Sequence, residues 1–192
     1  KDVWDTLPDM PTKRGALGLV ALDGKIYAIG GAAYDTKFNT LEVYDIKTKT
    51  WETKKAMPTA REHVSIAAAG GKIYVMGGFT TDRFHSLKTV EAYDPKTDTW
   101  ETKEPMPLPL SGFSAAALND RIFIFGGQQG VAVSGEVHEY DTKKNVWHRN
   151  GDLPSPRYAA VAVTLNDKIH LLGGSTRDGI YGFLKNHEVF TP

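Results

Sequence analysis

Three arginines stand at matching points of the sequence, where their side chains could recognise an anion. Arg14, Arg61 and Arg157 each come three residues after a proline, and Glu62 and His63 follow the second of them. A guanidinium group presents paired N–H donors that match a carboxylate or a phosphate. The alternative role is structural, with each loop arginine bonded to neighbouring carbonyl groups or to an aspartate. The sequence leaves both roles open.

The arginines follow the period of an internal repeat of about 48 residues. Apolar runs that end in Gly-Gly recur with steps of 47, 49 and 47 residues, and four tryptophans keep the same steps. The tryptophans are Trp4, Trp51, Trp100 and Trp147, and a proline follows each by seven residues. A repeat of this length is typical of propellers and solenoids.

The turn residues inside each repeat predict strands. Two apolar runs are joined by Asp23-Gly24 in the first repeat, and by Gly-Gly or Asn-Asp in the others. Such pairs tolerate positive φ and favour tight hairpins. A third strand ending in Tyr-Asp and a fourth strand carrying tryptophan complete the unit, and no segment shows sustained helical periodicity. The sequence therefore predicts an all-β fold, a β-propeller of four blades that are each a four-stranded antiparallel sheet.

The two ends of the chain carry complementary parts of one repeat. Val3-Trp4-Asp5 resembles a fourth strand, and Glu188-Val189-Phe190 resembles a third strand without a fourth. We expect residues 1–11 to supply the closing outer strand of the last blade, so that residues 1–192 form a single domain, a monomeric ring without bare sheet edges. The alternatives are a four-repeat piece of a larger ring, or an open arc that pairs with a second copy.

Composition narrows the classes of function. The chain is 41% hydrophobic and 24% charged, as in soluble globular proteins, and its 23 basic and 23 acidic residues give zero net charge. We therefore expect neither a nucleic acid nor a membrane as partner. Cysteine is absent, no two histidines have metal-site spacing, and nucleophile motifs are missing, so no metal or cofactor is predicted. No targeting segment indicates a compartment.

The succession of Gly-Gly, Tyr-Asp, Trp, Met-Pro and Arg resembles the kelch repeat over essentially the whole chain. Leu110 in place of the arginine, Leu153 in place of methionine, and Phe190-Thr191 in place of Tyr-Asp depart from the pattern. The resemblance implies a propeller with a peptide-docking face. Kelch-type copper oxidases depend on a cysteine-modified tyrosine, which this chain cannot form.

Strand parity places the variable loops and the arginines on one face. The loops are residues 32–40, 79–89, 128–136 and 175–187. Aromatic residues in or beside them complete the predicted binding set with Arg14, Arg61, Arg157 and His63: Tyr34, Phe79, Phe84, Phe113, Tyr158 and Tyr181. Exposed aromatics near arginines are typical of protein-binding hot spots. Alternatively, some of these rings cover blade edges.

Three functions remain open at this stage. The first is a non-catalytic module that binds a protein or peptide, with acidic groups matching the arginines. The second is a small-molecule enzyme resembling the bacterial kelch-like sialic acid mutarotases. It would use arginines for the sugar carboxylate and Glu62 or His63 for proton transfer, although adjacent strand residues point to opposite faces. The third is a structural or engineered repeat protein without a ligand.

Overall fold

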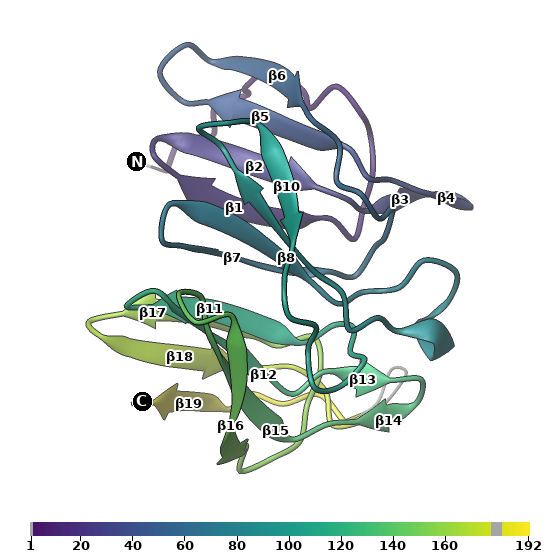
Figure 1. Ribbon diagram of the computed structural model, residues 1–192, viewed down its shortest axis with the longest axis vertical. Coiled ribbons are helices and arrows are strands. Elements are labelled where there is room, and N and C mark those ends of the chain that lie inside the picture. Colours follow the sequence, from purple (N-terminus) through teal and green to yellow (C-terminus); the bar gives the residue numbers. More distant parts are fainter. Residues whose placement is uncertain (1, 178–181) are drawn as a thin grey trace.

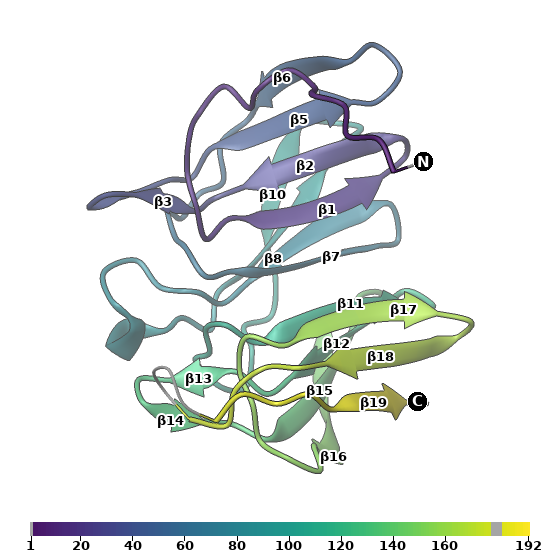
Figure 2. The ribbon, with the colours of Figure 1, turned by 180° about the vertical axis from the view of Figure 1, so that it is seen from behind.

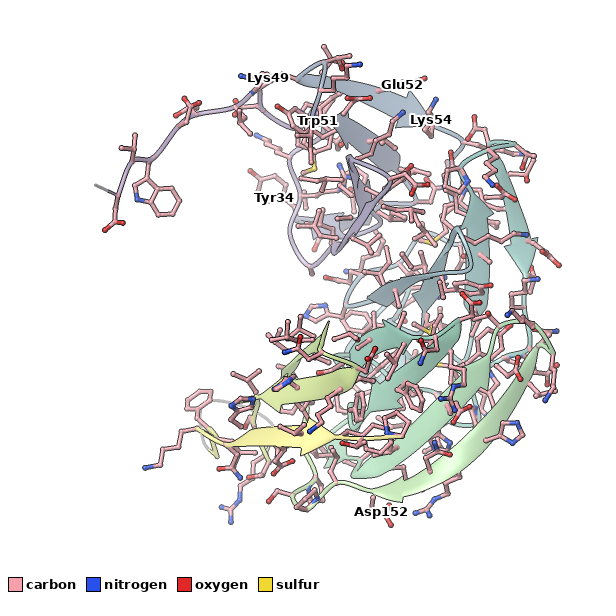
Figure 3. All side chains as sticks on the ribbon, turned by 90° about the vertical axis from the view of Figure 1, so that its left-hand side faces the viewer. Tyr34, Lys49, Trp51, Glu52, Lys54 and Asp152 are labelled. Carbon is pink, nitrogen blue, oxygen red and sulfur yellow. The ribbon has the colours of Figure 1, made fainter. Side chains whose placement is uncertain are left out.

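Four small antiparallel sheets follow one another in chain order around an arc (Figures 1 and 3). A computed structural model describes residues 2–177 and 182–192 of the chain. The first three sheets have four strands each, and the last has three. The predicted all-β fold with four blades is therefore confirmed.

Each blade is built in the order that the repeat predicts. Blade 1 contains β1 (Gly18–Leu22), β2 (Lys25–Ile29), β5 (Leu41–Asp45) and β6 (Thr50–Lys54). Blade 2 contains β7 (Ser65–Ala69), β8 (Lys72–Met76), β9 (Val90–Asp94) and β10 (Thr99–Thr102). Blade 3 contains β11 (Ser114–Leu118), β12 (Arg121–Phe125), β15 (Glu136–Asp141) and β16 (Val146–Asp152). Blade 4 contains β17 (Val161–Leu165), β18 (Lys168–Leu172) and β19 (His187–Phe190).

The hairpin turns have the positive φ angles that their residue types predict. Asp23 and Gly24 have φ of 50° and 72°, and Asn119 and Asp120 have φ of 52° and 60°. Two consecutive positive φ angles match the twist of the flanking strands. These turns fix the register of the two inner strands, in which Leu22 lies opposite Lys25 and Leu118 opposite Arg121.

The variable loops share one face of the arc, as parity predicts. They carry the hairpins β3 (Ala32–Ala33) with β4 (Thr36–Lys37) and β13 (Gln128–Gln129) with β14 (Ala132–Val133), and the short 3₁₀ helix η1 (Arg83–His85). Figures 1 and 2 show these elements projecting on one side, whereas the N and C ends lie on the other. We call the side with these elements the loop face.

The core lies between neighbouring blades. Each inner strand packs against the next, β1 against β7, β7 against β11, and β11 against β17. Aromatic pairs cross the same boundaries, with ring centroids 6.3 Å apart for Tyr27–Tyr93 and 5.8 Å apart for Tyr74–Tyr140. Large rings thus fill much of each junction, and small residues of the inner strands, such as Ala67 and Ala116, are buried in the same clusters between blades.

The Gly-Gly pairs hold the blades together as well as ending a strand. Gly31 N–H donates to the carbonyl oxygen of Arg61 in the next blade at 2.9 Å. Gly30, at φ +67°, lies so close to that carbonyl that an added Cβ would be 2.7 Å from its oxygen. Sequence patterns indicated the unusual backbone angles, whereas the close approach between blades is seen only in the structure.

Gly30→Ala is expected to lower the free energy of unfolding by about 3 kcal/mol, from a left-handed backbone and a clash with a carbonyl group. Gly24→Ala is the matched control. Gly24 also has positive φ, +72°, but nothing lies within 4 Å of the added Cβ, so its cost should be about 1 kcal/mol. Urea denaturation of both variants measures the difference, and equal losses would show that the close approach is unimportant.

Closure of the ring by the N-terminal strand is not observed. Trp4 is 97% exposed, and within the described residues β19 pairs only with β18. Trp51 Nε1–H donates to the carbonyl oxygen of Pro8 at 2.9 Å, just as Trp100 bonds Lys55 at 2.7 Å. Residues from Pro8 onward therefore follow the path of an inter-blade connection on blade 1. The preceding residues leave the arc, and Figure 3 shows an open gap between its first and last blades.

Candidate binding face

Arg61 lies inside blade 2, at the entry to its inner strand. Its side chain is fully buried, and it donates to the carbonyl oxygens of Gly77 at 2.9 Å and Val75 at 3.1 Å. Nη2 also bonds Glu91 Oε2 on the third strand at 2.9 Å. Burial lowers the pKa of the guanidinium, and the Glu91 carboxylate opposes this shift. The charged guanidinium group thus links the start of β7 to β8 and β9 within one blade.

The other two arginines repeat this arrangement. Arg14 contacts Glu42 at 2.5 Å and the carbonyl oxygens of Ala28 and Gly30, and Arg157 contacts Glu188 at 2.6 Å. All three arginine side chains are fully buried. These contacts correspond to the structural role that the sequence left open, with a glutamate in place of the expected aspartate. The guanidinium groups present no accessible donors to a ligand on the loop face.

Blade 3 replaces both members of the pair. Leu110 stands where the other blades have arginine, and His138 on β15 stands where they have Glu42, Glu91 or Glu188. Both residues are buried, and His138 Nε2 lies 2.7 Å from Glu136 Oε2. The sequence contains an indication of this pairing, because the glutamate and the arginine are missing from the same repeat. An apolar side chain removes the need for a buried carboxylate.

Four residues with positive φ mark the channel mouth on the loop face. They occupy the second position after each arginine or its replacement: Ala16 (52°), His63 (51°), Gly112 (58°) and Ala159 (53°). His63 N–H donates to Ala16, Gly112 N–H to His63, and Ala159 N–H to Gly112, each at the carbonyl oxygen. We call these four the mouth residues. Among the four, only His63 has a large side chain. Its positive φ is a backbone conformation that costs free energy in residues other than glycine.

His63 belongs to a small cluster at the mouth. Its ring stacks on Phe79, with centroids 5.0 Å apart, and its Nδ1 lies 3.3 Å from Glu62 Oε2. Lys37 Nζ contacts the other oxygen of Glu62 at 2.5 Å. The expectation that Glu62 and His63 point to opposite faces is wrong, because the left-handed backbone at His63 breaks the strand alternation. Arg61 nevertheless turns into the blade, so it does not converge with them as the enzyme hypothesis requires.

The predicted aromatic residues divide into exposed and buried groups. Tyr34, at 91%, and Phe84, at 59%, are exposed on the loop face, and Tyr158 is partly buried. Phe79 and Phe113 are buried, Phe79 beneath His63 and Phe113 in the core between blades 2 and 3. These two rings are therefore buried within the propeller and not exposed on the loop face. Tyr181 lies outside the described residues.

Two other features are absent from the part of the chain that the structure describes. No three histidine, aspartate or glutamate side chains there come together as a metal ion would require. None of the helices in that part is long and apolar enough to span a membrane.

The fold is a β-propeller of repeated blades, and a buried arginine–glutamate pair links strands within three of the four blades. Comparison with protein families assigns it more narrowly. Residues 3–127 match the KLHDC2/KLHL20/DRC7 Kelch-repeats domain, and residues 109–154 match the Kelch motif. The chain belongs to the Kelch-repeat family, in which propellers commonly bind proteins.

A relative from Arabidopsis thaliana matches a single repeat length. The F-box/kelch-repeat protein At4g39560 is 40% identical over 47 residues, which is 24% of this chain. The aligned stretch is only 18% of that protein. The likeness supports the kelch assignment. It concerns one repeat and not the activity of the whole relative.

Proposed function

We propose that this kelch propeller is a non-catalytic module that binds a protein or peptide through its loop face. The observation that carries the proposal is the placement of His63 in a strained conformation at the channel mouth, where the other three blades have alanine or glycine. The hydrogen bonds along the mouth residues hold all four positions at positive φ, and only at His63 does this conformation direct a large side chain to the mouth. His63 is half exposed there and rests on Phe79.

Exposed aromatic rings on the surrounding loops supply the contact area. Tyr34 projects from the hairpin between β3 and β4, and Phe84 lies on η1 against Gly130 of the next loop. Rings with one open face and a fixed backbone are typical anchors at protein interfaces. Lys37 and Glu62 provide one charge of each sign beside the mouth, so the surface suits a mixed polar and aromatic peptide better than a purely acidic one.

A random peptide library displayed on phage tests this proposal with a defined probe. Peptides selected on the wild-type chain should bind His63→Ala and Tyr34→Ala at least tenfold more weakly, a loss of about 1.4 kcal/mol. Alanine already occupies the position of His63 in two blades, so His63→Ala should fold normally.

Ile46→Ala is the matched control for the binding measurement. Ile46 is an exposed apolar residue on the turn between β5 and β6, at the end of the blade away from the loop face. Its replacement should leave peptide affinity unchanged. The proposal fails if no peptide is selected, or if selected peptides bind all three variants equally.

We also propose that a strand of the type Val3-Trp4-Asp5 completes blade 4. The sequence predicted that the chain supplies this strand to its own last blade. Support comes from the three complete blades, each of which places tryptophan on its fourth strand.

A further inference from the structure

Blade 3 carries an Asn-Gly pair on its fourth strand. Asn150 and Gly151 follow Trp147 by three and four residues, where the first two blades have Lys54-Lys55 and Lys103-Glu104. Asn150 is the one asparagine in the sequence that a glycine follows. The side-chain amide carbon of an asparagine is open to attack by the nitrogen of the next peptide group, and glycine has no side chain to hinder this approach. The pair is therefore a candidate for chemical modification.

The Asn-Gly pair forms a β-bulge between the third and fourth strands. Arg149 and Asp152 pair with residues of β15 that are only two apart, so Asn150 and Gly151 share one partner position. Gly151 has φ of +100°, and nothing lies within 4 Å of a Cβ built on it. A bulge leaves one residue unpaired and disrupts the ladder locally. The fourth strands of blades 1 and 2 have a continuous register, so this disruption distinguishes blade 3 from them.

The Asn150 side chain belongs to a small polar network. Its Nδ2 donates to Glu139 Oε2 at 2.9 Å, and Arg121 Nη1 donates to Glu139 Oε1 at 3.2 Å. The Glu139 carboxylate, which is largely buried, thus has one positive and one neutral partner. Side chains at such diagonal positions of two paired strands interact with each other. A carboxylate in place of the Asn150 amide would put two negative charges side by side.

Water has access to the modification site. Asn150 is exposed. The equivalent residues of the first two blades, Lys54 and Lys103, lie at complete junctions between blades and are still partly exposed. The access of water to Asn150 therefore does not depend on what completes blade 4.

We propose that Asn150 is a site of spontaneous deamidation, with the backbone nitrogen of Gly151 as the nucleophile. This nitrogen loses its proton to a base in the solvent and attacks Cγ of Asn150. The side-chain nitrogen takes up a proton and leaves as ammonia, and a five-membered succinimide ring remains. Water then adds to one of the two ring carbonyl carbons and breaks its C–N bond, which gives aspartate or isoaspartate. The balance is one water consumed and one ammonia released, without oxidation or reduction.

Both products change the fourth strand of blade 3. Aspartate in place of Asn150 replaces the hydrogen bond to Glu139 by repulsion between two carboxylates. Isoaspartate also adds a carbon atom to the main chain between Arg149 and Asp152, whose side chains form an ion pair at 2.6 Å. We therefore expect the modified chain to unfold at a lower urea concentration than the fresh chain.

Mass spectrometry of the aged protein tests the proposal. The folded wild-type chain is kept in mildly alkaline buffer, because loss of the peptide proton speeds the attack, and is then cleaved after lysine. Residues 145–168 form one fragment, in which Asn145 and Asn166 are internal controls followed by valine and aspartate. Asn150 should be converted at least about tenfold faster than either control, a difference of about 1.4 kcal/mol in activation free energy. Equal rates at the three asparagines would overturn the proposal.

A synthetic peptide of residues 145–168 shows whether the fold permits the reaction. The peptide gives the rate at Asn150 without the sheet, and the folded chain should also be converted on the timescale of the peptide reaction. An intact Asn150 in the folded chain, after complete conversion of the peptide, would show that β16 keeps the Gly151 nitrogen away from Cγ. That result would also overturn the proposal.

Two variants test the effect on stability. Asn150→Asp copies one product, and its urea midpoint should be below that of the fresh wild-type chain from the start. Asn150→Gln keeps an amide but moves its carbon one bond farther from the backbone, so the five-membered ring cannot form and the midpoint should not change with ageing. A converted wild-type chain with an unchanged midpoint would contradict the expected weakening of blade 3.

Discussion

Glu91→Ala should lower the free energy of unfolding by about 3–5 kcal/mol, one of the two largest effects that we expect from a single substitution in this chain. The change leaves the buried guanidinium of Arg61 with carbonyl partners but without its carboxylate. Glu91 Oε1 also accepts the hydroxyl of Thr59 at 2.8 Å, and this bond is lost too. Urea denaturation monitored by tryptophan fluorescence provides the measurement.

Two comparisons isolate the buried charge as the cause. Glu52→Ala removes another glutamate from an ion pair, with Lys54 at 2.5 Å, but that carboxylate is largely exposed, so its loss should cost less than about 1 kcal/mol. The double variant Arg61→Leu/Glu91→His places the leucine and histidine of blade 3 at these two positions of blade 2, and it should be more stable than Glu91→Ala alone. A loss at Glu91 no larger than the loss at Glu52 would contradict the structural role of these pairs.

Leu110→Arg is the second substitution with a large expected effect, again about 3–5 kcal/mol. It introduces a guanidinium at a buried position whose facing residue is His138 rather than glutamate. A buried charge without a countercharge is strongly unfavourable. The backbone carbonyls that bind arginine in the other blades offset only part of this cost.

Adding His138→Glu should recover part of the lost stability, because it recreates the pair of the other three blades. A double-mutant cycle in urea should give a favourable coupling of about 2–3 kcal/mol between the two substitutions. His138→Glu alone is expected to be destabilising, since it loses the contact with Glu136 at 2.7 Å and places a buried carboxylate beside the partly exposed one of Glu136. Additive losses in the double variant would show that Leu110 and His138 do not occupy the arginine and glutamate positions.

Much of the blade structure could be predicted from residue types alone. Turn pairs such as Asp23-Gly24 and Asn119-Asp120 tolerate the positive φ that two-residue hairpins need, and they recur at one period. The alternation of apolar strands and turns then leaves few ways to pair neighbouring strands. Local chemistry thus determined the strands, their order and the face that carries the loops.

The role of the arginines could not be read in the same way. Arg61 and Glu91 are 30 residues apart in the sequence. In addition, a guanidinium group uses the same N–H donors to bind a ligand anion and to link strands inside a blade. Only the folded blade, which brings the carbonyls of Val75 and Gly77 around the guanidinium, decided between the two. The joint absence of arginine and glutamate in the third repeat was the signal that could have suggested the pairing.

His63 shows a similar limit on the loop face. Its sequence neighbours predicted strand alternation, and its positive φ, set by the hydrogen bonds along the mouth residues, reverses that expectation. The stacking on Phe79 and the contact with Glu62 follow from this single backbone angle.

By itself, the sequence determined the repeated blade and the two-residue turns, because each depends on residues close together in the chain. The tertiary structure decided which way the arginines face and whether the arc closes on itself. The angle between blades is the net result of many side-chain contacts across each junction. No local pattern encodes that angle, and a small change in it, added over successive junctions, separates a closed ring from an open arc.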